Sequence, residues 1–317
     1  MNSESNKSDK NEMLILGHCI LNMNTRAPGI AAWPGSIFPI LRALRNYNGE
    51  IHQYPCPETA VVGSRRWWHV KEQYDTFTFR NLTKKLAMMY VNYSKRVGIN
   101  KVKLLGLGLS PTCGYRYTQS DIKWGGRPRE IDPTEEVKKG AGVLIEEMIN
   151  EFKNSGVKLE VLDVSPSLIY PDYKSRILSA KEYPDTPEGA LKEIEFFIHT
   201  QIPFNQKEVA HIFGLKDDLR SKQTIVVPRK VFEVGFEKVV EYAEKGIGIS
   251  LIEDIYGNEE EKEFLSLIYS SMIGNMIYAG HNVKIMIMDS KVDELTNDII
   301  TKLEELIPKD KVMIIKY

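Results

Sequence analysis

Short apolar runs alternate with longer amphipathic stretches along this chain. In the first half, apolar runs that predict β-strands cover residues 13–16, 50–54, 102–107 and 159–164. Apolar residues recur at helical spacing over residues 37–44 and 79–97, and again from the helix-start signal Asp132-Pro133 to Phe152. Strands that alternate with long helices predict an α/β fold with a doubly wound parallel sheet.

A proline-rich segment interrupts this alternation, which then resumes. Residues 165–188 hold four prolines and predict a loop or linker. Helices and strands are then expected in turn at residues 191–199, 224–227, 231–244, 247–252, 259–275, 283–288, 292–306 and 312–317. We therefore expect a disordered tail at residues 1–12, a first domain at 13–165, a linker with a helix at 166–205, and a second, smaller α/β domain at 206–317.

Each of the three cysteines of the chain follows one of the first three predicted strands. Cys19 follows residues 13–17, Cys56 follows residues 50–54, and Cys113 follows residues 103–107. Because ligands of parallel α/β sheets bind beyond the carboxyl ends of the strands, neighbouring strands would bring the three thiols together. Three thiolates suit an iron–sulfur cluster that keeps one iron open for chemistry.

The motifs around these cysteines resemble those of the thiouracil desulfidase family. The likeness rests on the strand-end position of Cys19, on Cys56-Pro57-Glu58 and on Ser110-Pro111-Thr112-Cys113-Gly114, and it covers about residues 13–165. It implies a 4Fe–4S cluster on Cys19, Cys56 and Cys113 with one iron not bound by protein. That iron takes the sulfur of a thiolated base, and water replaces the sulfur on the carbon.

The chain also departs from the family pattern. Asn24-Thr25-Arg26-Ala27 stands where family members carry a Tyr-Asp-Gly turn, and residues 60–66 replace a Gly-Leu-Pro segment. The second half of the chain extends beyond the compact family fold. The resemblance therefore predicts the cluster and leaves the identity of the thiolated substrate open.

Two polar residues beside the cysteines are the candidates for catalysis. We expect Glu58 to act as the general base for the attacking water, and Ser110 to bind the substrate or relay a proton. The alternative is that both only brace their turns. His18 and His52 either adjust the site through hydrogen bonds to its ligands or are ordinary structural histidines. Residues 65–68, Arg-Arg-Trp-Trp, either stack on a nucleobase or form a partly buried loop.

Composition narrows the class of protein. The 317 residues carry a net charge of −1, without the basic excess that binding to nucleic acid or to a membrane surface requires. No run approaches the 18 apolar residues of a membrane span, and the polar first twelve residues lack a signal-peptide core. Three unpaired cysteines suit a reducing compartment. We expect a cytoplasmic protein with a small thiolated substrate, of open oligomeric state.

Three functions compete on this basis. The leading one is a carbon–sulfur bond-cleaving desulfidase that uses its cluster as a Lewis acid. The second is a non-catalytic iron–sulfur module for redox chemistry or oxygen sensing. A structural zinc site is disfavoured, because zinc prefers four ligands and closely paired cysteines, and the nearest two cysteines here are far apart in sequence.

Overall fold

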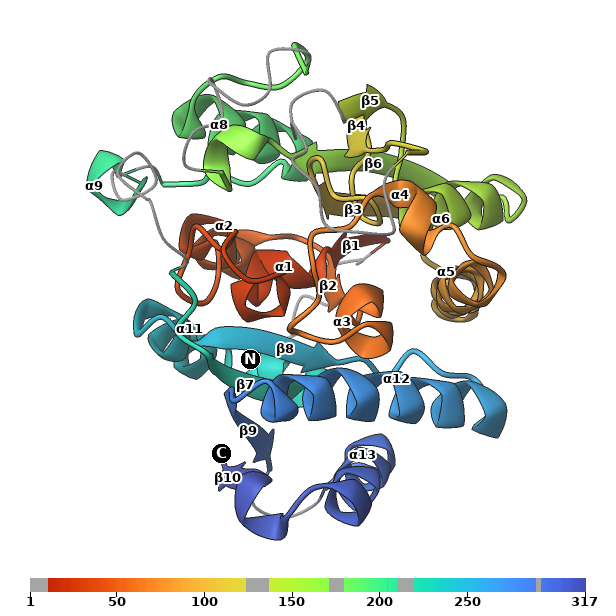
Figure 1. Ribbon diagram of the computed structural model, residues 1–317, viewed down its shortest axis with the longest axis vertical. Coiled ribbons are helices and arrows are strands. Elements are labelled where there is room, and N and C mark those ends of the chain that lie inside the picture. The colour runs from red at the N-terminus through yellow and green to blue at the C-terminus, as the bar shows by residue number, and fades with distance from the viewer. Residues whose placement is uncertain (1–10, 124–136, 171–179, 204, 210–218, 289–291) are drawn as a thin grey trace, which may run out of the picture.

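The computed structural model shows two parallel β-sheets flanked by helices (Figure 1). The residues that it describes are 11–123, 137–170, 180–203, 205–209, 219–288 and 292–317. The α/β fold predicted from the alternating pattern is confirmed, and the strands of the C-terminal half form a sheet of their own.

The first sheet has four strands in the order β2-β1-β3-β6. They are β1 (Glu12–Leu16), β2 (Glu50–Gln53), β3 (Lys101–Leu107) and β6 (Lys158–Val164). The helices of this part are α1 (His18–Leu21), α2 (Phe38–Ala43), α3 (Pro57–Val61), α4 (Lys71–Tyr74), α5 (Phe77–Val97), α6 (Val143–Lys153) and α8 (Pro187–Ile198). Because β1 lies between β2 and β3, the carboxyl ends of these three strands meet at one edge of the sheet.

The helix α5 shows how the local sequence sets an element. The side chain of Thr76 accepts a hydrogen bond from the Phe79 backbone N–H at 3.3 Å and caps the first turn. Gly98, at a φ of 78°, ends the helix in the left-handed conformation that glycine adopts without strain. Leu86 and Tyr90 lie one turn apart on its face against the sheet, and both are fully buried.

The second sheet repeats the strand order of the first. Its order is β10-β9-β7-β8, so in both sheets the first strand in sequence lies between the second and the third. Its strands are β7 (Gln223–Pro228), β8 (Gly248–Ile252), β9 (Asn282–Ile287) and β10 (Met313–Lys316). The helices of this half are α9 (Gln206–Val209), α10 (Arg229–Val234), α11 (Phe236–Glu244), α12 (Glu259–Tyr278) and α13 (Glu294–Leu306).

Two local predictions need correction. The helix expected from Asp132-Pro133 has its start outside the described residues, and Val137 belongs to a short strand, β5 (Val137–Lys139), that pairs antiparallel with β4 (Tyr117–Gln119). The helix α6 begins only at Val143, after a bend at Gly140, whose φ of 138° no helix can hold. The helix expected at 231–244 is divided at Gly235 into α10 and α11.

The N-terminal boundary is also shifted. Glu12, expected at the end of a disordered tail, is the first residue of β1. Its carboxylate accepts a hydrogen bond from Tyr47 at 2.8 Å and forms an ion pair with the buried Lys103 at 2.9 Å, so the polar side chain is stabilised inside the fold. The prediction for residues 1–10 lies outside the described residues.

The two sheets meet edge to edge, with β2 facing β8 (Figure 1). Hydrogen bonds from side chains join the two edges in place of backbone pairing between strands. The Gln53 side chain donates to the Ile249 carbonyl at 3.0 Å and accepts from the Leu251 N–H at 2.6 Å. Beside it, His52 Nδ1 lies 2.6 Å from an oxygen of Glu253, and all these groups are buried.

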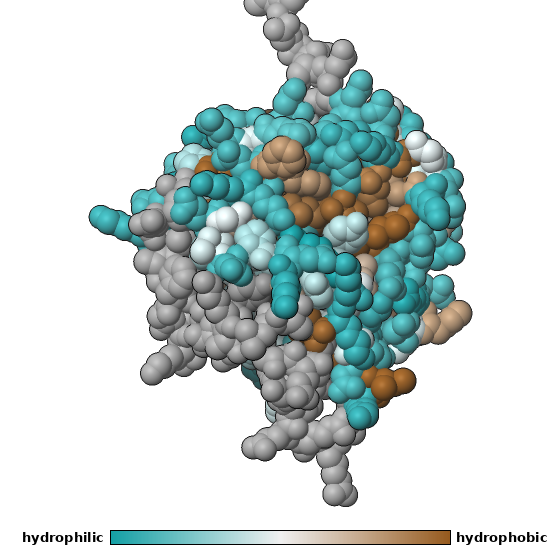
Figure 2. All heavy atoms as spheres, turned by 90° about the horizontal axis from the view of Figure 1, so that it is seen from above, coloured by the Kyte–Doolittle hydropathy of each residue, from teal (hydrophilic) through white to brown (hydrophobic). Residues whose placement is uncertain are grey.

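The apolar core runs across both sheets. Leu14 and Leu16 pack in one cluster with strand residues of the second sheet, and Met13 and Ile15 pack in another on the opposite face. At the far edge of the first sheet, β6 leaves Lys158 exposed and the next residues half-buried. Seen from this end, the coloured surface is mostly hydrophilic, with hydrophobic residues gathered in one larger area and scattered singly elsewhere (Figure 2). Among the described residues, no helix is long and apolar enough to cross a membrane.

Candidate functional site

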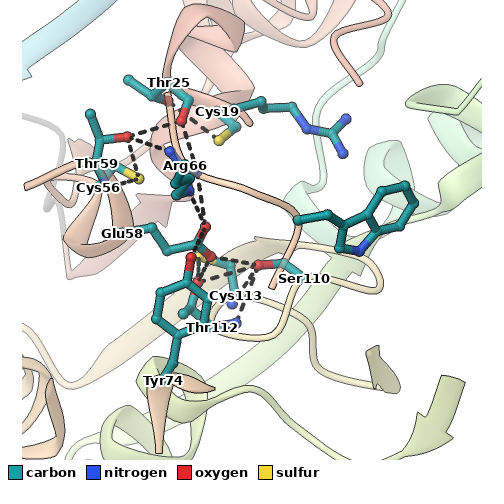
Figure 3. Close-up of polar contacts among 12 residues, drawn as sticks. Cys19, Thr25, Cys56, Glu58, Thr59, Arg66, Tyr74, Ser110, Thr112 and Cys113 are labelled. Atoms are coloured by element: carbon teal, nitrogen blue, oxygen red, sulfur yellow. Dashed lines mark hydrogen bonds and ion pairs between the residues drawn. The ribbon is translucent and has the colours of Figure 1, made fainter. Parts of the chain in front are cut away.

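The three cysteines line a single cavity at the carboxyl edge of the first sheet. Cys19 lies in α1 directly after β1, Cys56 caps the first turn of α3 after β2, and Cys113 lies in the loop after β3. Glu58 and Ser110 line the same cavity. The structure therefore brings together all five residues that the sequence singled out (Figure 3).

A close backbone approach positions Cys113. The Cys113 carbonyl accepts a hydrogen bond from the Leu107 N–H at 3.1 Å, which folds the loop back onto the end of β3. A Cβ atom at Gly106 would lie 2.1 Å from that carbonyl oxygen, so only glycine fits at this position. Further support comes from Ser110, whose hydroxyl accepts from the Cys113 N–H at 3.0 Å.

Each cysteine sulfur has a threonine hydroxyl beside it. The pairs are Cys19 with Thr25 at 3.4 Å, Cys56 with Thr59 at 3.3 Å, and Cys113 with Thr112 at 3.3 Å. The Thr59 backbone N–H also donates to Cys56, at 3.4 Å. The three hydroxyls also donate to oxygen acceptors: Thr25 to the Asn22 carbonyl at 2.8 Å, Thr59 to the Thr25 carbonyl at 2.9 Å, and Thr112 to Glu58. The Thr59 N–H is therefore the donor that suits a sulfur with negative charge, because hydrogen bonds to thiolate sulfurs tune metal clusters.

A buried ion pair between Glu58 and Arg66 connects the three cysteine-bearing segments. Arg66 donates to Glu58 Oε2 at 2.9 Å, to the Thr25 carbonyl at 2.9 Å and to Thr59 Oγ1 at 3.2 Å (Figure 3). Glu58 reaches the third segment, because Thr112 Oγ1 donates to Glu58 Oε1. The ion pair therefore holds the loops after β1, β2 and β3 in register with one another.

Four donors surround the carboxylate of Glu58. Oε1 accepts from Thr112 and, at 3.4 Å, from Ser110, while Oε2 accepts from Arg66 and, at 3.2 Å, from Tyr74. A carboxylate offers about four acceptor sites, so these donors fill it. The Ser110 contact is the longest of the four, and a water molecule can replace it most easily.

The thiols influence one another electrostatically. A hydrogen bond from the Cys56 thiol lowers the pKa of Cys19, with a further contribution from the Arg26 guanidinium. The same hydrogen bond, together with burial, raises the pKa of Cys56. Burial and the Glu58 carboxylate raise the pKa of Cys113 to about 12. Of the three thiols, that of Cys19 is thus the one that ionises most readily.

Aromatic rings form the outer part of the cavity. Trp68 stacks with Tyr170 at a ring-centroid distance of 6.4 Å and 24° between planes, and the Arg26 guanidinium lies 4.8 Å from the centre of the same tyrosine ring. The indole N–H of Trp68 donates to Gln119. Trp67 is 79% exposed at the cavity. Of the four residues 65–68, Arg66 thus pairs with Glu58, whereas the two tryptophans line the cavity.

The two histidines next to the cysteines in sequence have structural roles. His18 bonds the Tyr54 carbonyl at 3.0 Å and the Ser250 hydroxyl at 2.9 Å, and burial lowers its pKa to about 4. His52 pairs with Glu253 across the two sheet edges. Both therefore join the halves of the molecule, and the structural interpretation of these residues holds.

The helix α12, in the second half of the chain, contacts the segment that carries Cys56. The Met272 sulfur in α12 accepts from the Cys56 N–H at 3.3 Å, and the Asn275 amide donates to the Thr59 and Ala60 carbonyls at 2.9 and 3.1 Å. Within the part of the chain that the structure describes, the cavity is lined only by residues up to Tyr170. These contacts from α12 fix α3, and none of the described residues of the C-terminal unit lines the cavity.

Sequence reasoning missed several residues of the site, of which Tyr74 and His69 line the cavity. Thr59 and Thr112 were within reach, because each directly adjoins a recognised cysteine motif. Tyr74 and His69 carry no such signal, since they lie in α4 and in the loop before it, well away from every cysteine in sequence. Only the path of that loop across the cavity brings them to the site.

The donor set fits a cluster with three protein ligands. Three soft sulfur donors come from three separate segments, and the chain has no fourth cysteine. Among the described residues, no three His, Cys, Asp or Glu side chains are grouped tightly enough to hold a single metal ion.

Comparison with known proteins adds one relative. An uncharacterized protein of Methanocaldococcus jannaschii is 27% identical over 151 residues, which are 47% of this chain and 83% of that protein. No protein-family model matches the chain. No solved structure matches it either.

Proposed function

We propose that the protein is a 4Fe–4S-dependent desulfidase that removes sulfur from a small thiolated compound by hydrolysis. One observation carries this proposal: the thiols of Cys19, Cys56 and Cys113 line the same cavity as Glu58 and Ser110. Three thiolates leave one iron of such a cluster without a protein ligand, and that iron supplies a Lewis-acid site for sulfur when the cluster is bound.

The residues around the thiols have distinct tasks in this proposal. Glu58 and Ser110 bind the water that replaces the sulfur. The hydrogen bond between them is long, at 3.4 Å, so a water molecule can replace it and bond to both side chains. Arg66 holds Glu58 in place through a hydrogen bond of 2.9 Å. The thiocarbonyl group enters between the thiols and this pair.

The outer cavity favours a planar substrate. Trp68 and Tyr170 present stacked aromatic faces, and Gln119 lies within hydrogen-bonding reach of the same indole. Flat heterocycles stack on such faces and use amide groups for edge recognition. A thiolated nucleobase or a related ring fits these features, and we propose that the reaction takes place in the cytoplasm without nucleic-acid or membrane partners.

The proposal is tested with protein reconstituted without oxygen. Iron and sulfide content should reach about four of each per chain, as a 4Fe–4S cluster requires. Sulfide release from 2-thiouracil and 4-thiouracil is then measured, with Cys113→Ser as the matched control. Full cluster content without sulfide release from either compound would instead favour a non-catalytic redox or oxygen-sensing module, and a colourless protein would refute the cluster.

A further inference from the structure

A histidine that no cysteine motif marks lines the same cavity. His69 lies in the loop between α3 and α4, three residues after Arg66, and its side chain is half-buried. Its ring contacts the ring of Tyr74 at a centroid distance of 5.2 Å with 60° between planes. The Tyr74 hydroxyl in turn donates to Glu58 at 3.2 Å (Figure 3). One tyrosine therefore contacts both the His69 ring and the carboxylate that binds the attacking water.

One nitrogen of this ring is buried without a partner. Within the described part of the chain, no atom forms a hydrogen bond with His69 Nδ1. Buried polar atoms in folded proteins nearly always have a partner, so an unpaired one at a cavity wall indicates a group kept for a ligand. His69 differs in this respect from His18 and His52, whose two ring nitrogens are both bonded.

Glu58 cannot easily accept the proton that the reaction releases. Its carboxylate already accepts from Thr112, Ser110, Arg66 and Tyr74. Protonation would cost the ion pair with Arg66, so Glu58 is better suited to hold the water than to receive its proton. A second acceptor in the cavity is therefore required, and His69 is a titratable side chain there with a free nitrogen.

We propose that His69 Nδ1 is the proton acceptor of the desulfidation reaction. The inference rests on the proposed function and names the residue that moves the proton. As the water oxygen bonds to the thiocarbonyl carbon, one water proton moves to Nδ1 and the electron pair of the carbon–sulfur π bond moves to sulfur. When the carbonyl forms, the carbon–sulfur bond breaks, the remaining hydroxyl proton goes to sulfur, hydrosulfide leaves, and His69 returns its proton to solvent.

The surroundings of His69 keep it ready to accept a proton. Burial lowers its pKa below the usual value, Glu58 of α3 opposes this shift, and Arg66 of the same loop adds to it. The neighbouring Tyr74 of α4 is a neutral group at this position, because burial raises its own pKa. The imidazole is therefore neutral at neutral pH and takes up a proton only when one is delivered by the reaction.

The kinetic test compares His69→Gln and His69→Ala with the wild type in protein loaded with its cluster. Both variants should keep their iron and lose about a hundredfold to ten-thousandfold in kcat, the usual effect of a positioned acid or base. The wild-type rate should fall as the pH drops through the pKa of His69, below about 6.5, and both variants should lack this acidic limb. Added imidazole should partly restore His69→Ala, which a structural role would not explain.

The control is His199→Asn, which changes an exposed histidine at the end of α8 and should leave the rate and its pH profile unchanged. Wild-type turnover in His69→Gln, with the acidic limb intact, would overturn the inference while the desulfidase function stands.

A second measurement does not depend on turnover. In protein with 15N-labelled histidines, 4-thiouracil should shift the ring nitrogen resonances of His69, assigned by their loss in His69→Gln. Unchanged His69 resonances at saturating 4-thiouracil would refute its contact with the reacting group. A shift in protein that releases no sulfide would keep His69 as the ligand contact and refute only the desulfidase function.

Discussion

The imidazole of His52 and the carboxylate of Glu253 form a buried pair across the two sheets, with Nδ1 2.6 Å from Oε2. The other ring nitrogen of His52 lies 3.1 Å from Glu50, which also faces Arg229 at 3.4 Å. A charged group thus stands at the junction of β2 and β8, where residues 201 positions apart in sequence meet.

We predict that this pair makes stability depend on pH. Burial and the positive charge of Arg229 both disfavour the charged imidazole. Glu253 and Glu50 outweigh these two effects and raise the pKa of His52. The charged His52 therefore contributes fully to the free energy of unfolding below the usual histidine pKa of about 6.5. This contribution is lost as the pH rises through the raised pKa of His52. On the acid side, the hydrogen bond from His52 lowers the pKa of Glu50 to about 2, so that contribution is lost as the pH falls towards 2.

Urea unfolding of His52→Gln between pH 5 and 9 checks this prediction. The variant should lose about 3–5 kcal/mol near pH 6, because it leaves Glu253 buried without its cation. Its stability should also vary less with pH than that of the wild type. The double variant His52→Gln/Glu253→Gln is the control and should recover part of the loss, and a single variant as stable as the wild type would contradict the prediction.

Each cysteine should be required for the cluster. Cys19→Ser, Cys56→Ser and Cys113→Ser should each lose most of the iron that the wild type retains after anaerobic reconstitution, because a three-ligand site has no spare thiolate. Ser110→Ala is the control, since it lines the same cavity without being a ligand. A Cys113→Ser variant with a normal iron content would show that the thiols do not act together.

Glu58 and Ser110 should affect turnover and not the cluster. Glu58→Gln and Ser110→Ala should keep their iron, and each should lower the rate of sulfide release by about a hundredfold, because each positions the attacking water. Arg66→Gln provides a comparison, because it removes the cation 2.9 Å from Glu58 and should also loosen the loops that carry Cys19 and Cys56. Unchanged turnover in either of the first two variants would remove that residue from the proposed mechanism.

Gly106 should matter as much for cluster binding as a ligand does. Gly106→Ala would place a Cβ atom 2.1 Å from the Cys113 carbonyl oxygen, so the loop must move and the variant should lose iron and about 1–3 kcal/mol of stability. Gly274→Ala in α12 is the matched control, because its Cβ would meet its nearest neighbours at 3.6 and 3.7 Å. Equal iron content in both variants would contradict this account of the loop.

The sequence alone predicted the alternating fold and the convergence of the cysteines, because both follow from local rules. Apolar periodicity identifies strands and helices, and Cys19, Cys56 and Cys113 each directly follow a strand of a parallel sheet. The error at Val137 has a physical cause. Val137 and Ala141 match helical spacing, but the glycines at 140 and 142 break the backbone, so Val137 pairs in a strand and the helix starts later.

The remaining features depend on contacts that no local pattern encodes. The unpaired nitrogen of His69 and the contact between Tyr74 and Glu58 follow from how one loop crosses the cavity. The pairing of His52 with Glu253 likewise needs the second sheet to be placed beside the first. Only tertiary structure shows such relationships.

The side chain of Gln53 has a consequence for the behaviour of the protein in concentrated solution. An open strand edge is a template onto which another chain can add a strand, and this is a common route to aggregation. The amide of Gln53 occupies the Ile249 carbonyl and the Leu251 N–H, as a neighbouring peptide group would. The edge strand β8 of the second sheet is thereby closed to intermolecular strand addition, although the two sheets remain separate.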